Sequence, residues 1–169
     1  MGAVIRKAFL GSIPDVRQIA LTTWPVAYRD ILSTAQLAYM LEVMYTEAAL
    51  KAQFQAGHEF LVAYMEETAV GFASYATQYQ GKAVLRIHKL YVLPDHQRMG
   101  IGASLLDAID AAAQRAGASA LNLNVNRFNT AKGFYLKHGF RIVRDEVIDI
   151  GKGYVMDDHV MERATAVGV

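Results

Sequence analysis

The sequence contains no cysteine, which excludes disulfide bonds, thiolate metal sites and a cysteine nucleophile. Prolines number only three among 169 residues, and no Pro/Gly-rich linker divides the chain. No apolar run approaches the roughly 20 residues of a membrane helix. The segment 1–10 also lacks the apolar core of a signal peptide. We therefore expect a single domain, residues 1–169, in the cytoplasm, with no membrane partner.

The chain also has no large excess of charge of either sign, because its formal net charge is +1. A dedicated nucleic-acid binder usually has a strong basic excess, so no nucleic-acid partner is expected. The five histidines are scattered, and none pairs at ligand spacing, so no metal site is predicted. Hydrophobic residues make up 53% of the chain, which is enough to bury a core.

Hydrophobic periodicity and turn signals predict the element order β-α-α-β-β-β-α-β-α-β-β. Ser12 is expected to cap the first helix, and Trp24-Pro25 to end or kink it. The second helical region should break near Thr46. An ordinary crossover makes two strands parallel, those at 82–93 and 119–125. The fold class is α/β, a mixed sheet with helices on its faces. The expected strands are 3–9, 59–65, 70–79, 82–93, 119–125, 140–150 and 154–163, and the last two helices are 102–116 and 130–137.

The strongest functional signal lies between the strand at 82–93 and the helix that follows it. There the chain reads Gln97-Arg98-Met99-Gly100-Ile101-Gly102. A helix start offers free N–H groups and partial positive charge to an anion. Gly100 and Gly102 let a ligand approach the backbone, while Arg98 and Ser104 add polar contacts. Glycine content alone fits an ordinary tight turn equally well. The Lys-Ser/Thr ending of a P-loop and the third glycine of a dinucleotide loop are both absent.

Two elements together resemble one known family. Gln97-x-x-Gly100-x-Gly102, preceded by Leu90-Tyr91-Val92, resembles the acyl-CoA pyrophosphate loop of the Gcn5-related N-acetyltransferase (GNAT) family. Downstream, the segment from Asn129 through Phe134-Tyr135 to Gly139-Phe140 resembles that family's Asn…Phe-Tyr…Gly-Phe segment. Asn129 precedes Tyr135 by six residues, where many family members have seven. The sequence support for a cofactor contact at Asn129 is therefore weaker than that for the glycine loop.

The resemblance implies a GNAT-like acyl-CoA N-acyltransferase fold with splayed parallel central strands and acetyl-CoA as co-substrate. The pantetheine arm would lie in the gap between those strands and bond to the backbone of one of them. The pyrophosphate would lie on the glycine loop, and two residues would flank the arm from the other side. In this chain the strand residues are Leu90, Tyr91 and Val92, the loop residues are Gln97, Arg98, Gly100, Ile101, Gly102 and Ser104, and the flanking residues are Asn129 and Lys132.

The implied reaction is direct attack of a neutral primary amine on the thioester. Tyr135 matches the family's tyrosine near the coenzyme sulfur, so it is the candidate acid for the departing thiolate. Many relatives have a carboxylate in the run before the central motif, and here that position is His88. An imidazole could accept the proton directly or through water. Both side chains could instead have purely structural roles, Tyr135 as a packed ring and His88 on a strand face.

The acceptor is the least determined part of the prediction. Aromatic and acidic residues in the segments that shape the family's acceptor pocket suit a small cationic amine, as in the polyamine acetyltransferase branch that this chain loosely resembles. Two alternatives remain: a protein or peptide N-acetyltransferase, and a non-catalytic acyl-CoA-binding module. The alternating apolar run 155–161 permits a homodimer. The candidate substrate residues are Trp24, Tyr28, Glu42 and Tyr154.

Overall fold

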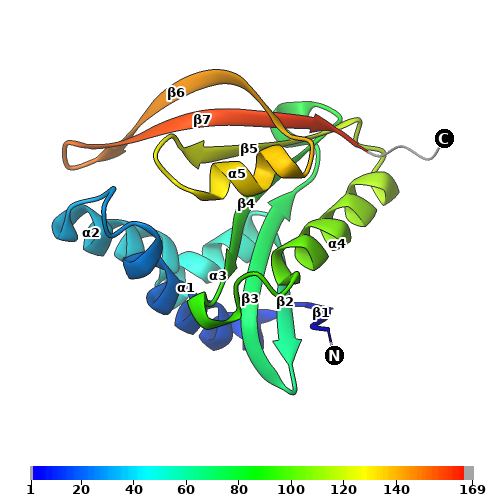
Figure 1. Cartoon of the computed structure of the whole chain (residues 1–169), viewed down its shortest axis with the longest axis horizontal. Coiled ribbons are helices and arrows are strands. Elements are labelled where there is room, and N and C mark those ends of the chain that lie inside the picture. Colours follow the sequence, from blue (N-terminus) through cyan, green and yellow to red (C-terminus); the bar gives the residue numbers. More distant parts are fainter. Residues whose placement is uncertain (1, 166–169) are drawn as a thin grey trace.

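The computed structural model describes residues 2–165. One mixed sheet has the strand order β1-β2-β3-β4-β5-β7-β6, and helices lie against it (Figure 1). This arrangement confirms the predicted fold class. The element order agrees with the prediction except that the second helical region is divided into two helices, at the break expected near Thr46. The strands are β1 (Val4–Lys7), β2 (Glu59–Met65), β3 (Thr68–Ala76), β4 (Val84–Val92), β5 (Ala120–Asn126), β6 (Arg141–Gly151) and β7 (Tyr154–Ala164). The α-helices are α1 (Ile13–Ala27), α2 (Thr34–Tyr45), α3 (Glu47–Gln55), α4 (Ile101–Arg115) and α5 (Ala131–Lys137).

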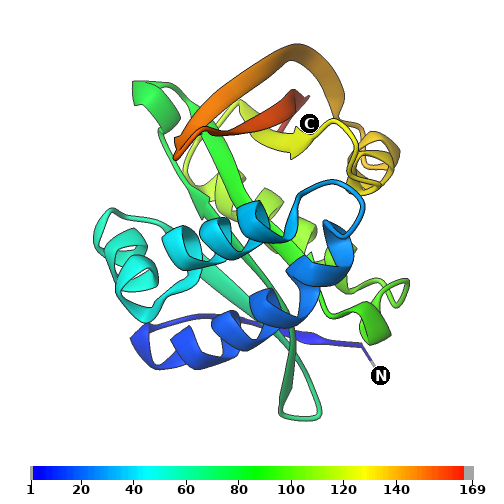
Figure 2. The same ribbon diagram turned by 90° about the vertical axis from the view of Figure 1, so that its left-hand side faces the viewer.

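The two faces of the sheet carry two separate cores. Helices α1, α2 and α3 cover one face, in front of the strands in Figure 2, and bury Trp24, Tyr45 and Phe72. Helix α4 covers the other face, where Leu105 and Ile109 pack against β4 and β5. Tyr135 and Phe134 of α5 belong to this second core. Any cavity that passes between two strands therefore joins two different environments.

The first helices differ from expectation in two details. Pro25 does not end α1, which runs on to Ala27. Proline removes one N–H and crowds the preceding turn, but here it is exposed and only two helical residues follow it. Ser12 does not cap α1 with its side chain; its hydroxyl instead accepts the N–H of Phe9 at 3.2 Å. Thr46 does cap α3 at the expected break, accepting the N–H of Ala49 at 3.1 Å.

The central strands β4 and β5 are parallel, as predicted, but they pair only from Val84–Ala120 to Ile87–Leu123. Beyond that point β4 stays with β3, and β5 stays with β7. In Figure 1, β5, β6 and β7 cross the top of the molecule while β2 and β3 run downward. The predicted gap between the splayed central strands therefore lies between the second halves of β4 and β5.

A β-bulge marks the point where β4 leaves β5. Tyr75 pairs with Ile87 and its neighbour Ser74 pairs with Lys89, so His88 is the extra residue. Such a bulge reverses the alternation of side chains between the two faces. Ile87 consequently packs in the α4 core, whereas Lys89 lies on the α1–α3 face, with its Nζ 5.5 Å from the ring centroid of Tyr45.

Within residues 2–165, no helix has both the length and the apolar character that crossing a membrane requires. Strand β6 forms one edge of the sheet, and three of its apolar side chains are exposed, those of Ile142, Val143 and Val147. The homodimer expected from the C-terminal strands stays a prediction.

Candidate functional site

A cavity of about 250 Å³ lies where β4 and β5 diverge. It reaches both faces of the sheet, because Tyr135 and Ala131 come from the α4–α5 side and Met40 and Met44 from α2 on the other. The opening therefore provides two routes to one point. The residues predicted from sequence that line it are Trp24, Tyr28, His88, Leu90, Tyr91, Asn129 and Tyr135.

Tyrosine hydroxyls gather around this cavity. Tyr135 is only 7% exposed, and its pKa is raised well above the ordinary value, first by burial and then by the nearby Tyr28. The hydroxyls of Tyr28 and Tyr91 are 3.1 Å apart and hydrogen-bonded. Asn129 interacts with the Tyr28 hydroxyl, and its Oδ1 accepts the N–H of Ala131 at 2.9 Å where α5 begins. Tyr135 is thus held protonated, in the state that donates a proton.

His88 lines the cavity, but its ring stacks on that of His58. Its pKa is lowered to about 3, by burial first and then by the charges of His58, Lys89 and Arg86. The ring is therefore neutral at physiological pH. It has a free site for a proton but little affinity for one, which weakens the case for His88 as the base.

Three more charged side chains line the cavity. Asp158 is among the acidic residues that suggest a cationic acceptor, whereas Lys89 and Arg86 are not singled out from the sequence. Asp158 is 5% exposed and Lys89 6% exposed. Burial raises the pKa of Asp158 and lowers that of Lys89 to about 8. Asn124 donates to Asp158 Oδ2 at 3.2 Å, whereas Oδ1 is buried without a partner. Arg86 bonds to Asn122. The cavity thus contains a carboxylate and two cations.

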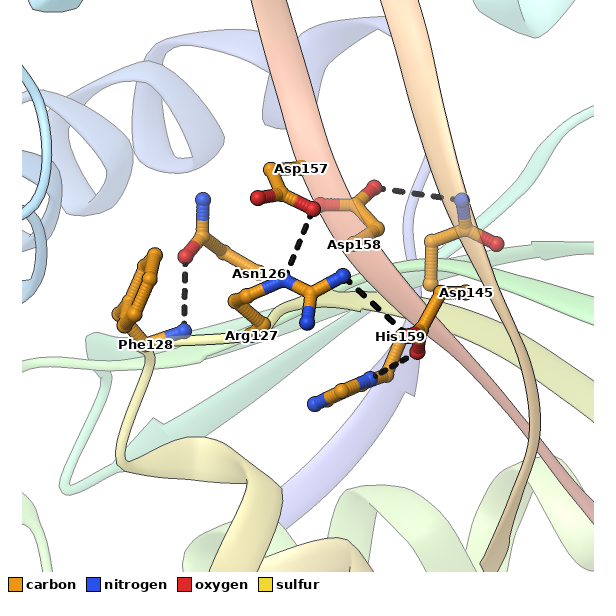
Figure 3. Close-up of polar contacts among 8 residues, drawn as sticks. Asn126, Arg127, Phe128, Asp145, Asp157, Asp158 and His159 are labelled. Carbon is orange, nitrogen blue, oxygen red and sulfur yellow. Dashed lines mark hydrogen bonds and ion pairs between the residues drawn. The ribbon is translucent and has the colours of Figure 1, made fainter.

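The tip of β5 is held by a separate ionic network (Figure 3). Arg127 Nε donates to Asp157 Oδ1 at 2.8 Å, and its Nη2 lies 3.3 Å from Asp145 Oδ2. His159 Nδ1 lies 2.6 Å from Asp145 Oδ1, and this hydrogen bond is the main reason that the pKa of Asp145 is lowered. These contacts join β5, β6 and β7. The carboxylate of Asp157 is bound to Arg127 in this network, whereas its neighbour Asp158 faces the cavity.

The glycine loop forms the start of α4. Gly100 is the N-cap, with φ +79°, and Arg98 is also left-handed, with φ +65°. A Cβ on Gly100 would meet no atom within 4 Å, whereas one on Gly102 would lie 3.4 Å from the ring of Phe134. Gly100 thus allows the turn and leaves space above it, while Gly102 lets α4 approach α5. First-turn N–H groups have no partner within a helix, which suits an anion.

The remaining loop residues take several positions. Gln97 Nε2 donates to the carbonyl of Val92 at 3.2 Å. The side chain of Ile101 is buried in the core, so only its backbone faces the loop. Ser104 and Lys132 are half-buried, on α4 and α5. None of these side chains lines the cavity, so the loop and the cavity are neighbouring but distinct parts of the site.

Two predicted substrate residues do not reach the cavity. Glu42 lies on the exposed side of α2, since Met40 and Met44 take the inward positions. Tyr154 packs on Tyr39, with ring centroids 5.4 Å apart. Trp24 and Tyr28 do line it. In residues 2–165 no cluster of His, Asp and Glu is arranged for a metal ion, and the absence of a metal cofactor stays a prediction.

The comparisons with known proteins agree with this architecture. Residues 29–155 match the family model for the acetyltransferase (GNAT) domain. An uncharacterized N-acetyltransferase of Bacillus subtilis, YjcF, is 34% identical over 67 residues. That match spans 39% of this chain and 46% of the relative, so the chain covers less than half the length of this curated protein.

Solved structures extend the likeness over nearly the whole chain. The PaiA N-acetyltransferase of Thermoplasma acidophilum, in complex with coenzyme A, has a TM-score of 0.81 at 23% identity, covering 97% of this chain and 99% of that one. A GCN5-related N-acetyltransferase of Rhodopseudomonas palustris has a TM-score of 0.83 at 22% identity, covering 97% and 96%. The ribosomal-protein-S18-alanine N-acetyltransferase of Escherichia coli has 0.72 at 15%, covering 99% and 96%. At these identities the likeness establishes the fold.

Proposed function

Because the chain belongs to the Gcn5-related N-acetyltransferase family, we propose that it transfers the acetyl group of acetyl-CoA to a primary amine by direct attack. One observation carries the proposal. The cavity passes through the sheet between β4 and β5 with Tyr135 in its wall. Donor and acceptor can therefore meet from opposite faces, beside a hydroxyl that donates a proton.

The donor side fits a coenzyme. Beyond Ile87 and Leu123, the edges of β4 and β5 that face each other make no ladder bonds to one another. Unpaired strand edges bind an extended chain, so they suit the amides of the pantetheine arm. The open, left-handed turn at Gly100 and the start of α4 suit the pyrophosphate. When bound, acetyl-CoA supplies an activated thioester.

The chain supplies the proton transfers. The Tyr135 hydroxyl lines the cavity and would protonate the departing thiolate, and its raised pKa keeps the proton available at all physiological pH values. For the amine, the sequence predicts His88, but the unpartnered Oδ1 of Asp158 is the stronger proton acceptor. A base works best when its pKa lies near the working pH, and burial moves Asp158 toward that range and His88 away from it.

The size of the cavity favours a small acceptor over a folded protein, since about 250 Å³ lies just below the usual range of small-molecule sites, roughly 300–1,000 Å³. A polyamine stays a prediction: Asp158 is the one carboxylate among the described residues that line the cavity, and the cations Arg86 and Lys89 line it as well. Two other acidic residues in the segments expected to shape the acceptor pocket are already paired, Glu47 with Lys51 and Asp157 with Arg127.

The test is direct. Calorimetry should detect binding of acetyl-CoA to the purified chain, and release of the coenzyme thiol should depend on an added primary amine. A panel of alkylamines, diamines, amino acids and short peptides covers the acceptor classes. Failure to bind acetyl-CoA would contradict the proposal outright. Binding without amine-dependent thiol release across the panel would instead favour the non-catalytic acyl-CoA-binding module.

A further inference from the structure

Lys89 is a buried cation without an ionic partner. It is 6% exposed, and no carboxylate of residues 2–165 lies within ion-pair distance of its Nζ. Its Nζ makes a cation–π contact with the ring of Tyr45, whose centroid is 5.5 Å away. Burying an ammonium group without a counter-charge is costly. Because Lys89 lies in a cavity wall, a bound anionic group would supply the counter-charge that the protein lacks there.

The position of Lys89 excludes the phosphates of a coenzyme as that counter-charge. The bulge at His88 turns Lys89 to the α1–α3 face of the sheet. The glycine loop starts α4, which covers the opposite face. Lys89 therefore belongs to the end of the cavity that the acceptor enters. Near that end, Trp24 Nε1 and Tyr45 Oη are buried and interact with each other, but neither makes a hydrogen bond of ordinary geometry within residues 2–165.

Lys89 and Asp158 do not neutralise each other. The cation that acts on Asp158 is Arg86, whereas the groups that feel the charge of Lys89 are His58 and His88. Asp158 Oδ1 has no partner either. The cavity thus holds a carboxylate and an ammonium group that are not paired with each other, and each can still bind a group of opposite charge. A ligand that satisfies both carries the opposite pair, an ammonium and a carboxylate.

We propose that the acetyl acceptor is a small amine bearing a carboxylate, whose carboxylate binds Lys89 while its amino group lies at Asp158. This inference rests on the proposed acetyl transfer and specifies its substrate class. A charge-assisted bond in a buried site is stronger than a neutral one. A diamine or polyamine, in contrast, would place a second cation against Lys89.

The test compares acceptors of equal length that differ only at the far end: linear amino carboxylates, alkylamines and diamines of about two to six carbons. We expect the wild-type kcat/KM to be highest for an amino carboxylate. Lys89→Met should lower that value by roughly 30-fold or more, corresponding to loss of one partner of a buried charge pair, and should change the value for the alkylamine far less. Lys89→Arg should retain most of the preference.

Lys82 provides a matched control. It is exposed and precedes β4, so Lys82→Met removes the same charge outside the cavity. This variant should keep the wild-type preference. Acetyl-CoA binding and the melting temperature of each variant report whether it folds.

The outcomes are separable. A wild type that turns over alkylamines or diamines as well as amino carboxylates overturns the inference and leaves acetyl transfer intact. An equal fall for all acceptors in Lys89→Met also overturns it, because Lys89 would then act on structure or chemistry alone. Absence of any amine acetylation contradicts the proposed function itself. If Lys89→Met fails to fold, the wild-type ranking of the three acceptor classes by kcat/KM and the same measurement on Lys89→Gln still test the inference.

Discussion

The imidazole rings of His58 and His88 lie face to face, with centroids 4.1 Å apart and planes 5° from parallel. His58 immediately precedes β2, and His88 is the bulged residue of β4. Burial lowers the pKa of both rings, and the charge of Lys89 lowers them further. Protonating either ring would place a cation against its neighbour in a half-buried site. The pair is therefore held neutral, which bears directly on which group takes the proton of the amine.

The first prediction separates His88 from Asp158 as the base. With a pKa of about 3, His88 does not titrate between about pH 5 and pH 9. His88→Gln should lower kcat by less than about tenfold and leave the shape of the pH profile unchanged. Asp158→Asn removes the carboxylate and should lower kcat by roughly 100-fold or more. Steady-state kinetics over this pH range measure both.

An acid limb near the ordinary pKa of histidine would contradict this assignment if it disappeared in His88→Gln. His88 would then be the base, as the sequence predicts. If Asp158 is the base, kcat falls as the pH drops toward its pKa, because protonation removes the acceptor. That pKa lies above 3.8.

The second prediction concerns Tyr135 as the proton donor. Tyr135→Phe keeps the ring and removes the hydroxyl, so coenzyme binding should change by less than about twofold while kcat falls roughly 100-fold. Calorimetry measures the first quantity and single-turnover kinetics the second. Tyr75 belongs to the same core but does not line the cavity, so Tyr75→Phe should leave kcat near the wild-type value. Equal kcat in Tyr135→Phe and wild type would exclude Tyr135 as the acid.

The third prediction uses two glycines of the same helix. Gly100 precedes α4 with φ +79°, Gly117 follows it with φ +70°, and a Cβ on either would meet no atom within 4 Å. Alanine at each should therefore cost a similar free energy of unfolding, on the order of 1–2 kcal/mol for the left-handed backbone. Only Gly100→Ala adds a methyl group where the coenzyme is expected to approach.

Coenzyme binding should distinguish the two variants. We expect the Kd for acetyl-CoA to rise at least about tenfold in Gly100→Ala, from strain and crowding at an anion site, and to stay near the wild-type value in Gly117→Ala. Calorimetry with thermal unfolding of each variant gives both quantities. A similar loss of affinity in both variants would mean that helix stability, and not the loop, controls binding.

Local signals were sufficient for the elements and for the turn in which the coenzyme loop is predicted. Apolar periodicity located the helices, and Gln97-x-x-Gly100-x-Gly102 between a strand and a helix located the turn that starts α4. Pro25 shows the limit of such signals. The cost of a proline depends on how many helical bonds follow it, which a local pattern does not reveal.

The far side of the cavity could be predicted only for Trp24 and Tyr28 of α1, because the positions of its charged residues depend on strand register. Simple alternation along β4 would put Ile87, Lys89 and Tyr91 on one face. The bulge at His88 depends on Ser74 and Tyr75 of another strand, and it moves Ile87 to the opposite face from the other two. Likewise, alternation places Asp157 and Asp158 on opposite faces, but only the pairing of Asp158 with Asn126 beside the opening shows which one meets the cavity.

The fourth prediction follows from the buried charge of Lys89. Burial lowers its pKa from 10.5 to about 8, so between these values the unfolded chain holds a proton that the folded chain has released. Stability rises with pH wherever the unfolded state binds more protons. The penalty for Lys89 is therefore complete below about pH 8 and disappears as the pH rises to 10.5.

The difference between wild type and Lys89→Met isolates this contribution. Methionine fills a similar volume without the charge, so the variant should be more stable at pH 7 by up to about 3 kcal/mol, the equivalent of this pKa shift. Its advantage should shrink as the pH rises from 8 to 10.5. Urea unfolding at a series of pH values measures this difference in the free energy of unfolding. Lys82→Met removes an exposed charge, so its difference from wild type should not change with pH. A pH-independent difference for Lys89→Met would mean that Lys89 is paired or solvated in the folded protein, and its cost would then no longer call for an anionic ligand.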